Sequence, residues 1–240
     1  MASACPVDTQ ELQRIAGAGP RHWWLQDRRE LIARELRRLP EPGRAVDVGA
    51  GIGDGCAVLL DHGWRVTAVD TGERAVELCR ARGADAHLAD PRWLPLPSAS
   101  YDLAVAFDVL SRLDDDHLAA AQLTRVLKPG GTALVAVPSD MALWSAHDVA
   151  LGRSRRHTRD TFAALLAGAG LALDEMWSRG IVVRPLVRRR RHRVDGWETR
   201  RRCTAVNRLL SWTLSAEQWL PATSLPGTWL VARAHRPHDG

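Results

Sequence analysis

The sequence predicts an α/β fold built on a mainly parallel sheet, and two patterns carry this prediction. Between residues 44 and 138, short apolar runs alternate with segments of helical periodicity. Strands separated by helices of about ten residues form parallel sheets with right-handed crossovers. The glycine-rich stretch DVGAGIG follows the first apolar run directly, at the position where open α/β sheets bind their ligands.

Hydrophobic periodicity places the individual elements. Trp24, Leu31 and Leu36 recur at helical spacing, so residues 22–39 are predicted to form an amphipathic helix that ends at Pro40. Strands are then expected around Val46 and Val48 and at residues 64–70, 84–90, 101–110, 132–138, 171–177 and 227–234, with helices at 54–62, 73–82, 115–127, 158–168 and 204–216. Residues 139–157 show no clean period and are interpreted as an insertion over the edge of the sheet.

This order of elements suggests one domain, residues 1–240, made of four parts. Residues 1–43 form an N-terminal helical cap and residues 44–138 the ligand-binding core. Residues 139–160 form a cap insertion, and residues 179–226 form an arginine-rich insertion before the last strand.

Composition indicates a soluble globular protein, with 45% hydrophobic and 25% charged residues. No apolar run approaches the roughly 18 residues that span a bilayer, and MASACPVDTQELQRIAG has neither the basic nor the apolar region of a secretory signal. Cys5, Cys56, Cys79 and Cys203 are far apart, which is typical of reduced thiols. We therefore expect a cytoplasmic protein, either a monomer or a homodimer.

The glycine stretch predicts a nucleoside site without a pyrophosphate. Gly49, Gly51 and Gly53 follow Asp47 at intervals of two residues, so the turn can approach a ligand closely. The third glycine position of a dinucleotide fingerprint is occupied by Asp54, and the G-K-S/T phosphate loop is absent from the sequence.

Two aspartates follow the next two strands and extend this site. Asp70 is suited to accept hydrogen bonds from both hydroxyls of a ribose, and Asp90 from an exocyclic amine. Any one of these glycines or aspartates could instead serve a turn or a helix cap. Their order on successive strand ends favours the ligand site.

These motifs resemble those of class I S-adenosylmethionine-dependent methyltransferases over residues 44–138. VDVGAGIG, VTAVD and HLAD match the first three motifs of that family, and YDLAVAFDVLSRLDDD with LTRVLKPGGTALVAVP matches the next two. The resemblance implies a Rossmann-like fold with a seven-stranded, mostly parallel sheet, helices on both faces and an antiparallel last strand at GTWLVARA. It also implies S-adenosyl-L-methionine as cofactor and S-adenosyl-L-homocysteine as product.

The outer motifs HWWLQDRRELI, LWSAHDVALGRSRRHTRDTFAALLAGAGL and LPGTWLVARA resemble a bacterial subgroup that acts on small molecules, glycan intermediates and secondary metabolites. The resemblance implies contacts to the methionine and ribose portions from Asp47, Gly49, Ala50, Gly51 and Gly53, to the ribose and adenine from Asp70, Thr71, Asp90 and Pro91, and to the methionine end from Phe107 and Asp108. Trp24 and Arg28 would fold over the cofactor, with Arg28 pairing its carboxylate. The alternative for this pair is a packed helix face with a solvated arginine.

The chain departs from the family pattern at three places. Pro91 has no backbone N–H to offer the adenine ring, and Ser111–Arg112 stands where Glu–His is common. Arg153 and His157 replace the usual histidine and tyrosine of the later motif.

The acceptor side of the site is expected in the cap insertion. His147 or His157 is the predicted general base, because histidine titrates near neutral pH. Trp144, Asp148 and Arg156 are the predicted substrate contacts. A hydrogen-bonding role for each histidine and a packing role for Trp144 are the alternatives, and no metal site is predicted.

The sequence thus predicts methyl transfer to oxygen or nitrogen of a small-molecule acceptor. One alternative is an RNA methyltransferase that uses VRRRRHRVDGWETRRR, residues 187–202, and another is a protein of this fold with different chemistry. Nucleic acid is disfavoured because the positive charge is confined between two late strands and Lys128 is the one lysine. The arginine segment is suited to an anionic substrate, an acidic carrier protein or a membrane surface, unless it is a solvated loop.

Overall fold

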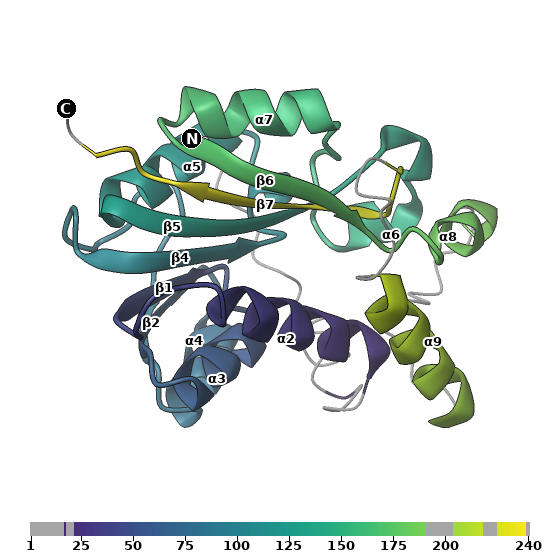
Figure 1. Ribbon diagram of the computed structural model, residues 1–240, viewed down its shortest axis with the longest axis horizontal. Helices are drawn as coiled ribbons and strands as arrows, with labels where there is room; N and C mark the ends of the chain where they lie inside the picture. Colours follow the sequence, from purple (N-terminus) through teal and green to yellow (C-terminus); the bar gives the residue numbers. More distant parts are fainter. Residues whose placement is uncertain (1–16, 18–21, 191–203, 218–224, 239–240) are drawn as a thin grey trace.

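The computed structural model describes residues 17, 22–190, 204–217 and 225–238, which form one sheet between two layers of helices (Figure 1). The strands are β1 (Arg44–Val48), β2 (Arg65–Asp70), β3 (Asp85–Leu88), β4 (Tyr101–Phe107), β5 (Leu127–Pro138), β6 (Ala172–Arg179) and β7 (Trp229–His235). Their order is β3-β2-β1-β4-β5-β7-β6, and β7 runs antiparallel to both of its neighbours. The predicted seven-stranded sheet with an antiparallel last strand is therefore confirmed.

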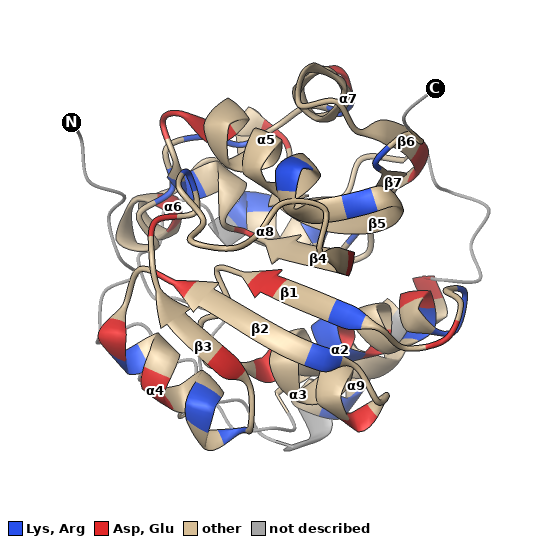
Figure 2. Cartoon of the chain, turned by 90° about the vertical axis from the view of Figure 1, so that its left-hand side faces the viewer, with Lys and Arg blue, Asp and Glu red and all other residues tan. Residues whose placement is uncertain are grey.

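Apolar side chains cover both faces of this sheet, which is why its strands read as nearly continuous hydrophobic runs. On one face, Val46 and Val48 pack in a core with α5 (Asp116–Val126) and α7 (Arg159–Gly168). On the other face, Ala45 and Val105 share a core with α2 (Trp23–Leu36), α3 (Asp54–Asp61) and α4 (Glu73–Ala81). Seen from the side, the sheet lies between these two helical layers (Figure 2).

The strand order reverses beside β1, because β2 pairs with it on one side and β4 on the other. Ligands of open α/β sheets bind at such a switch point, at the carboxyl ends of the strands. The glycine stretch leaves β1 at this point and leads into α3. The topology therefore puts the predicted nucleoside site where the fold offers a crevice.

Several elements differ from the sequence prediction, and β4 ends at Phe107 rather than at the predicted residue 110. β5 begins at Leu127, five residues before the predicted start, because Leu127 pairs with Tyr101 before the register shifts. The insertion after β5 contains the 3-10 helix η2 (Met141–Leu143) and the short helix α6 (Ala146–Ala150), which are too short to show a period. α8 (Arg184–Arg190) is helical although its arginines hide any apolar pattern.

The late insertion packs onto the N-terminal helix. α9 (Thr204–Glu217) contacts α2, and Val183, Val187 and Leu214 form an apolar cluster with Trp23 and Leu143. Most of the arginine-rich stretch lies outside the described residues, as do Cys5 and Cys203, whereas Cys56 and Cys79 are buried free thiols.

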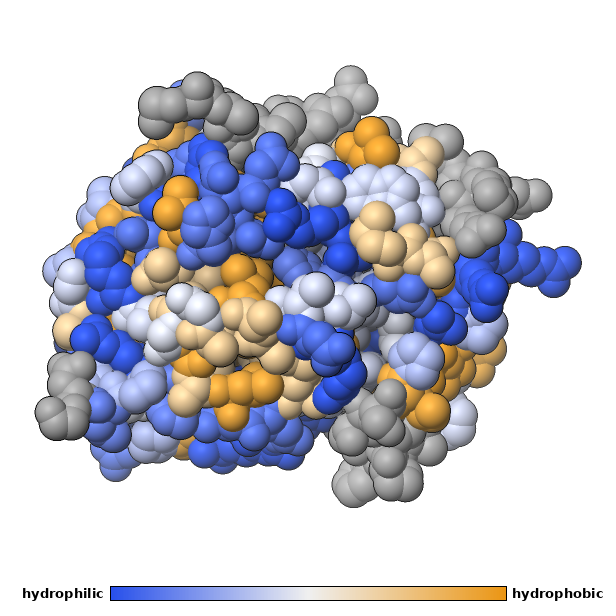
Figure 3. All heavy atoms as spheres, turned by 90° about the horizontal axis from the view of Figure 1, so that it is seen from above, coloured by the Kyte–Doolittle hydropathy of each residue, from blue (hydrophilic) through white to orange (hydrophobic). Residues whose placement is uncertain are grey.

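The surface above α5 and α7 is mixed, with hydrophobic side chains scattered among hydrophilic ones (Figure 3). Among the described helices, none has both the length and the apolar character needed to cross a membrane.

Candidate active site

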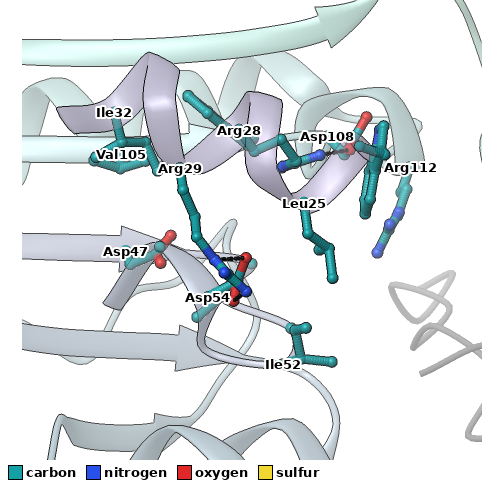
Figure 4. Close-up of a pocket in the computed structure, with 16 residues that line it drawn as sticks. Leu25, Arg28, Arg29, Ile32, Asp47, Ile52, Asp54, Val105, Asp108 and Arg112 are labelled. Carbon is teal, nitrogen blue, oxygen red and sulfur yellow. Dashed lines mark hydrogen bonds and ion pairs between the residues drawn. The ribbon is translucent and has the colours of Figure 1, made fainter. Parts of the chain in front are cut away.

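A pocket opens between α2 and the glycine stretch, at the carboxyl ends of β1 and β4 (Figure 4). It contains about 690 Å³ of empty space, part of which is open to solvent. The lining residues are Trp24, Leu25, Arg28, Arg29, Ile32, Asp47, Gly49, Ala50, Gly51, Ile52, Asp54, Gly55, Val105, Phe107, Asp108 and Arg112. Eight of the predicted site residues thus meet at one cavity: Trp24, Arg28, Asp47, Gly49, Ala50, Gly51, Phe107 and Asp108.

The glycine turn exposes its backbone to this pocket. Gly49 and Gly51 have φ values of 75° and 55°, a backbone conformation that residues other than glycine rarely adopt. A Cβ atom on Gly49 would lie 2.7 Å from the Cβ of Val109, whereas a Cβ on Gly51 would meet no atom within 4 Å. Gly49 is therefore required by packing, and the space at Gly51 is left to a ligand.

Asp47 is the fourth residue of β1 and is itself buried, and it lines the pocket. Its Oδ2 accepts a hydrogen bond of 3.4 Å from the Cys56 thiol. Burial raises the pKa of Asp47 to about 6, because desolvation disfavours the charged form. A cationic ligand group beside this carboxylate would stabilise its ionised form.

Helix α2 contributes two ion pairs that close the other side of the pocket. Arg29 donates to both oxygens of Asp54, at 2.7 and 2.6 Å. Arg28 donates to Asp108 Oδ2 at 2.5 Å. In Figure 4, Leu25, Arg28 and Arg29 project from α2 toward the residues of the sheet edge.

The Arg28 guanidinium also lies among three aromatic rings. Its Cζ atom is 4.7 Å from the ring centroid of Trp24, 5.0 Å from that of Phe107 and 5.4 Å from that of Trp229. Such cation–π contacts add to the ion pair with Asp108 in fixing the guanidinium. The predicted alternative of a solvated arginine does not describe Arg28, whose side chain is 20% exposed.

Asp108 connects the pocket to the cap insertion. Its Oδ1 accepts a 3.3 Å bond from Arg153, which also donates to Asp148 at 2.9 Å. Asp148 is fully buried and pairs with Arg156 at 2.9 Å. Asp148 and Arg156, predicted to contact the substrate, thus belong to a buried ion network behind the pocket and do not line it.

Arg112, at the end of the 3-10 helix η1 (Leu110–Arg112), lines the pocket at a position where sequence predicted no role. Burial lowers the pKa of its guanidinium below the ordinary value. Within the described residues, its Nε–H has no hydrogen-bond acceptor. A buried arginine in this state favours an anionic or polar ligand atom beside it.

The strand-end aspartates Asp70 and Asp90 do not line the pocket, and their carboxylates contact the protein itself. Asp70 accepts hydrogen bonds of 2.9 Å from the backbone N–H groups of Gly51 and Gly72, so it supports the glycine turn. Asp90 pairs with Arg92 at 2.7 Å, and this contact lowers the pKa of Asp90. Gly53, Thr71, Asp90 and Pro91 are not among the residues that line the pocket.

The two predicted general bases are buried in the cap insertion, away from the pocket lining. His147 lies on α6. The His157 ring packs 5.9 Å from Phe162, with its Nε2 3.7 Å from Asp116 Oδ2. Burial lowers the pKa of His157. Trp144, which follows η2, is likewise absent from the pocket lining.

Sequence reasoning missed several lining residues, among them Leu25, Arg29, Asp54 and Arg112. For two of them the sequence offered an indication. Asp54 stands at the third glycine position of the dinucleotide fingerprint, and Arg112 stands where the family pattern commonly has histidine. Leu25 and Arg29 lie on a helix whose orientation over the sheet the sequence does not give. Among the described residues, no group of three or more histidine, cysteine or acidic side chains could hold a metal ion.

Comparison with known proteins adds three observations. A family model described as a methyltransferase domain matches residues 23–176. A Mycolicibacterium smegmatis protein named as an S-adenosylmethionine-dependent methyltransferase is 30% identical over 181 residues, covering 73% of this chain and 68% of that protein. The malonyl-[acyl-carrier protein] O-methyltransferase of Enterobacter lignolyticus is 31% identical over 177 residues, covering 68% of this chain and 70% of the relative.

Among solved structures, a chain of the Haloferax volcanii complex between the Trm112 methyltransferase activator and a methyltransferase has the same fold. It superposes with a TM-score of 0.64 at 20% identity, over 96% of each chain.

Proposed function

The chain belongs to the class I S-adenosylmethionine-dependent methyltransferases, and on this basis we propose that it methylates an oxygen atom of a small-molecule acceptor. S-adenosylmethionine is the methyl donor. The observation that carries the proposal is the pocket between α2 and the glycine turn, at the switch point of the sheet. Its lining combines the Asp47 carboxylate, the glycine backbone and the aromatic rings of Trp24 and Phe107.

The residues of this pocket fit the cofactor. The open space at Gly51 lets a ligand reach the backbone, and the Asp47 carboxylate would hold the ammonium group of the methionine portion. Gly49, Ala50, Phe107 and Asp108 would border the same portion.

Bound S-adenosylmethionine supplies a methyl group on a positively charged sulfur, and the C–S bond breaks as a lone pair of the acceptor oxygen forms the new O–C bond. The chain holds the acceptor in line and excludes water, which lowers the entropic part of the barrier. A carboxylate acceptor arrives without a proton, and a hydroxyl acceptor such as a phenol would have to ionise before water is excluded from the pocket. Catalysis therefore requires no histidine in the pocket, and the roles of His147 and His157 as bases stay predictions.

Oxygen is favoured over nitrogen by Arg112, which lines the pocket. Arg28 and Arg29 are neutralised by Asp108 and Asp54, whereas the Nε–H of Arg112 has no acceptor among the described residues. Guanidinium groups attract an oxyanion and repel an acceptor ammonium group. The O-methyltransferase activity in the name of the Enterobacter lignolyticus relative supports the same choice, and its malonyl-[acyl-carrier protein] substrate supports a carrier-bound acceptor as one form of it.

Two measurements test the proposal. Calorimetry should detect 1:1 binding of S-adenosylhomocysteine to the wild type, a large loss in Asp47→Asn and no change in Asp85→Asn, whose carboxylate is exposed on β3. A screen with methyl-labelled cofactor against paired acceptors, each carboxylic acid or phenol matched with its amine analogue, should label the oxygen compounds. No cofactor binding, or labelling of amines alone, would overturn the proposal.

A further inference from the structure

A second cavity lies directly beside the first and shares three residues with it: Trp24, Arg28 and Phe107. It contains about 520 Å³ of empty space, open in part to solvent. The other lining residues are Trp23, Asp27, Leu31, Ala136, Arg179, Gly180, Val183, Leu214, Thr228, Trp229 and Val231. None of the glycine-turn residues borders this second cavity, so it is a separate compartment from the cofactor pocket.

The walls of the second cavity are mainly apolar. Leu31, Val183, Leu214 and Val231 are all buried aliphatic side chains, and Trp23 is 4% exposed. An apolar cavity of this kind gains free energy by taking up apolar surface from water, and it gives little to a polar ligand.

Most polar groups in these walls are already bound to the protein, whereas the Nε–H of Arg179 has no acceptor among the described residues. Asp27 and Arg179, which both line the cavity, form an ion pair with each other. The Gly180 N–H donates to Glu217 at 2.8 Å, and the Thr228 hydroxyl donates to the backbone oxygen of Arg179 at 3.4 Å. These contacts leave the aromatic and aliphatic surfaces as the main attraction for a ligand.

Segments that follow the core motifs build this compartment. Val183 comes after β6, Leu214 lies on α9, Thr228 precedes β7 and Trp229 is the first residue of β7. Val183 and Leu214 contact the N-terminal helix through the apolar cluster that includes Trp23. The compartment therefore depends on the outer parts of the chain, whereas the cofactor pocket depends on the glycine turn.

Arg28 stands at the boundary between the two cavities. Its guanidinium is fixed by Asp108 and by the rings of Trp24 and Phe107, which also belong to both linings. A molecule in the second cavity would lie with one end beside this guanidinium, which would meet an oxyanion favourably.

We propose that the second cavity is the acceptor pocket and that it selects acceptors with an apolar body, a ring system or an acyl chain, whose oxygen points past Arg28 toward the cofactor. This inference rests on the proposed function, and it adds the chemical class of the acceptor. The methyl transfer itself is the step given above, with the C–S bond broken and the O–C bond formed.

The first test uses the uncharged fluorescent probe N-phenyl-1-naphthylamine on the full chain. The wild type should bind it at one site with a fluorescence increase. Val183→Phe and Leu214→Phe place larger side chains in the cavity and should weaken binding at least tenfold. Leu209→Phe, on the same helix as Leu214 but 59% exposed, is the matched control and should bind like the wild type.

Folding and the cofactor site are checked in the same variants. Each should bind S-adenosylhomocysteine with the wild-type affinity, because none of the three positions borders the cofactor pocket. If a phenylalanine variant does not fold, Val183→Ala serves instead, and its weaker packing should reduce probe affinity several-fold. Probe binding that is unchanged in all pocket variants would overturn the inference, as would a wild type that does not bind the probe.

The second test compares acceptors by competition. Decanoate and a naphthoate should displace the probe at concentrations at which acetate and succinate do not. Displacement by the small polar acids alone would overturn the apolar class. The probe titration does not need the cofactor. If the wild type binds the probe but does not bind S-adenosylhomocysteine, the proposed function is refuted while the result on the apolar cavity stands.

Discussion

At the scale of single residues, Asp47 carries the most informative chemistry of the site. Its carboxylate is buried, and its pKa of about 6 lies within the range where binding can be measured. The protonated form prevails below that pH and cannot pair with the ammonium group of the cofactor. We expect the affinity for S-adenosylhomocysteine to be constant above pH 7 and to fall by up to about tenfold for each pH unit below 6.

Calorimetric titrations between pH 5 and pH 8 measure this dependence. Asp47→Asn should bind weakly with a flat pH profile in the same window, since the titrating group is gone. A wild-type profile that is equally flat would show that Asp47 does not bear on the cofactor.

The raised pKa of Asp47 also lowers the stability of the folded chain at neutral pH. An acid whose pKa is higher in the folded state than its ordinary value of 3.8 destabilises the fold once it ionises. The cost is absent below about pH 4, grows up to about pH 6 and is then constant. Asp47→Asn should therefore raise the free energy of unfolding at pH 8 by up to about 3 kcal/mol, measured by urea denaturation, with little gain at pH 4.

Gly49 is the residue at which the glycine turn tolerates no side chain. Gly49→Ala combines a left-handed backbone with a Cβ 2.7 Å from that of Val109, so we expect a loss of about 2 kcal/mol or more in unfolding free energy. Gly168→Ala is the control, because Gly168 ends α7 with no atom within 4 Å of the added Cβ and alanine is the better helix former. Equal denaturation midpoints for the two variants would contradict this explanation.

At the scale of elements, α2 is the helix whose position decides the site, and a buried carboxylate fixes it to the sheet. Glu35 is 2% exposed and accepts a 2.8 Å hydrogen bond from Arg233 of β7. Removing the Glu35 side chain leaves a void at a buried site and leaves Arg233 only its more exposed partner Glu175 among the described residues, so Glu35→Ala should cost about 2–4 kcal/mol in unfolding free energy.

The matched variant is Glu175→Ala, which removes the other carboxylate that Arg233 contacts, at 3.0 Å. The Glu175 side chain is 42% exposed, and we expect a cost of about 1 kcal/mol or less. Urea denaturation compares the two, and a larger loss for Glu175→Ala would show that α2 is held by other contacts.

The elements also show what sequence alone can predict. The strands of the core were predictable because each is a short apolar run that both helical layers bury, and Ala172–Arg179 and Trp229–His235 lie close to their predicted ranges. The helices α6 and α8 were not, because the first spans five residues and the second is mostly arginine. The division of the chain into a core and two insertions stays a prediction.

The candidate site was predictable to the extent that it is local. Asp47 and the glycine turn follow one strand, so their neighbourhood is set by the chain itself. Arg29 reaches Asp54 from a helix 25 positions earlier, a contact that depends on how α2 crosses the sheet. Asp70 follows its strand as predicted, yet its carboxylate holds the backbone of the glycine turn, which no sequence pattern reveals.

At the scale of the whole molecule, a ligand that binds the folded chain alone must raise its stability. S-adenosylhomocysteine at about 100 times its dissociation constant adds roughly 2.7 kcal/mol. For a chain of this length, that corresponds to an increase of about 5–10 °C in Tm. Differential scanning fluorimetry measures it, with NAD as the control ligand because the glycine turn lacks the dinucleotide fingerprint. An equal increase with NAD would contradict the assignment of the pocket.

Arg28 belongs to the walls of both cavities, and this has a thermodynamic consequence. A ligand in either cavity that shifts the guanidinium changes the shape and charge of the other cavity. Binding at the two sites is then coupled, and the coupling is reciprocal: the factor by which cofactor changes acceptor affinity equals the factor by which acceptor changes cofactor affinity. One arginine would thus set how strongly each substrate favours or opposes the binding of the other.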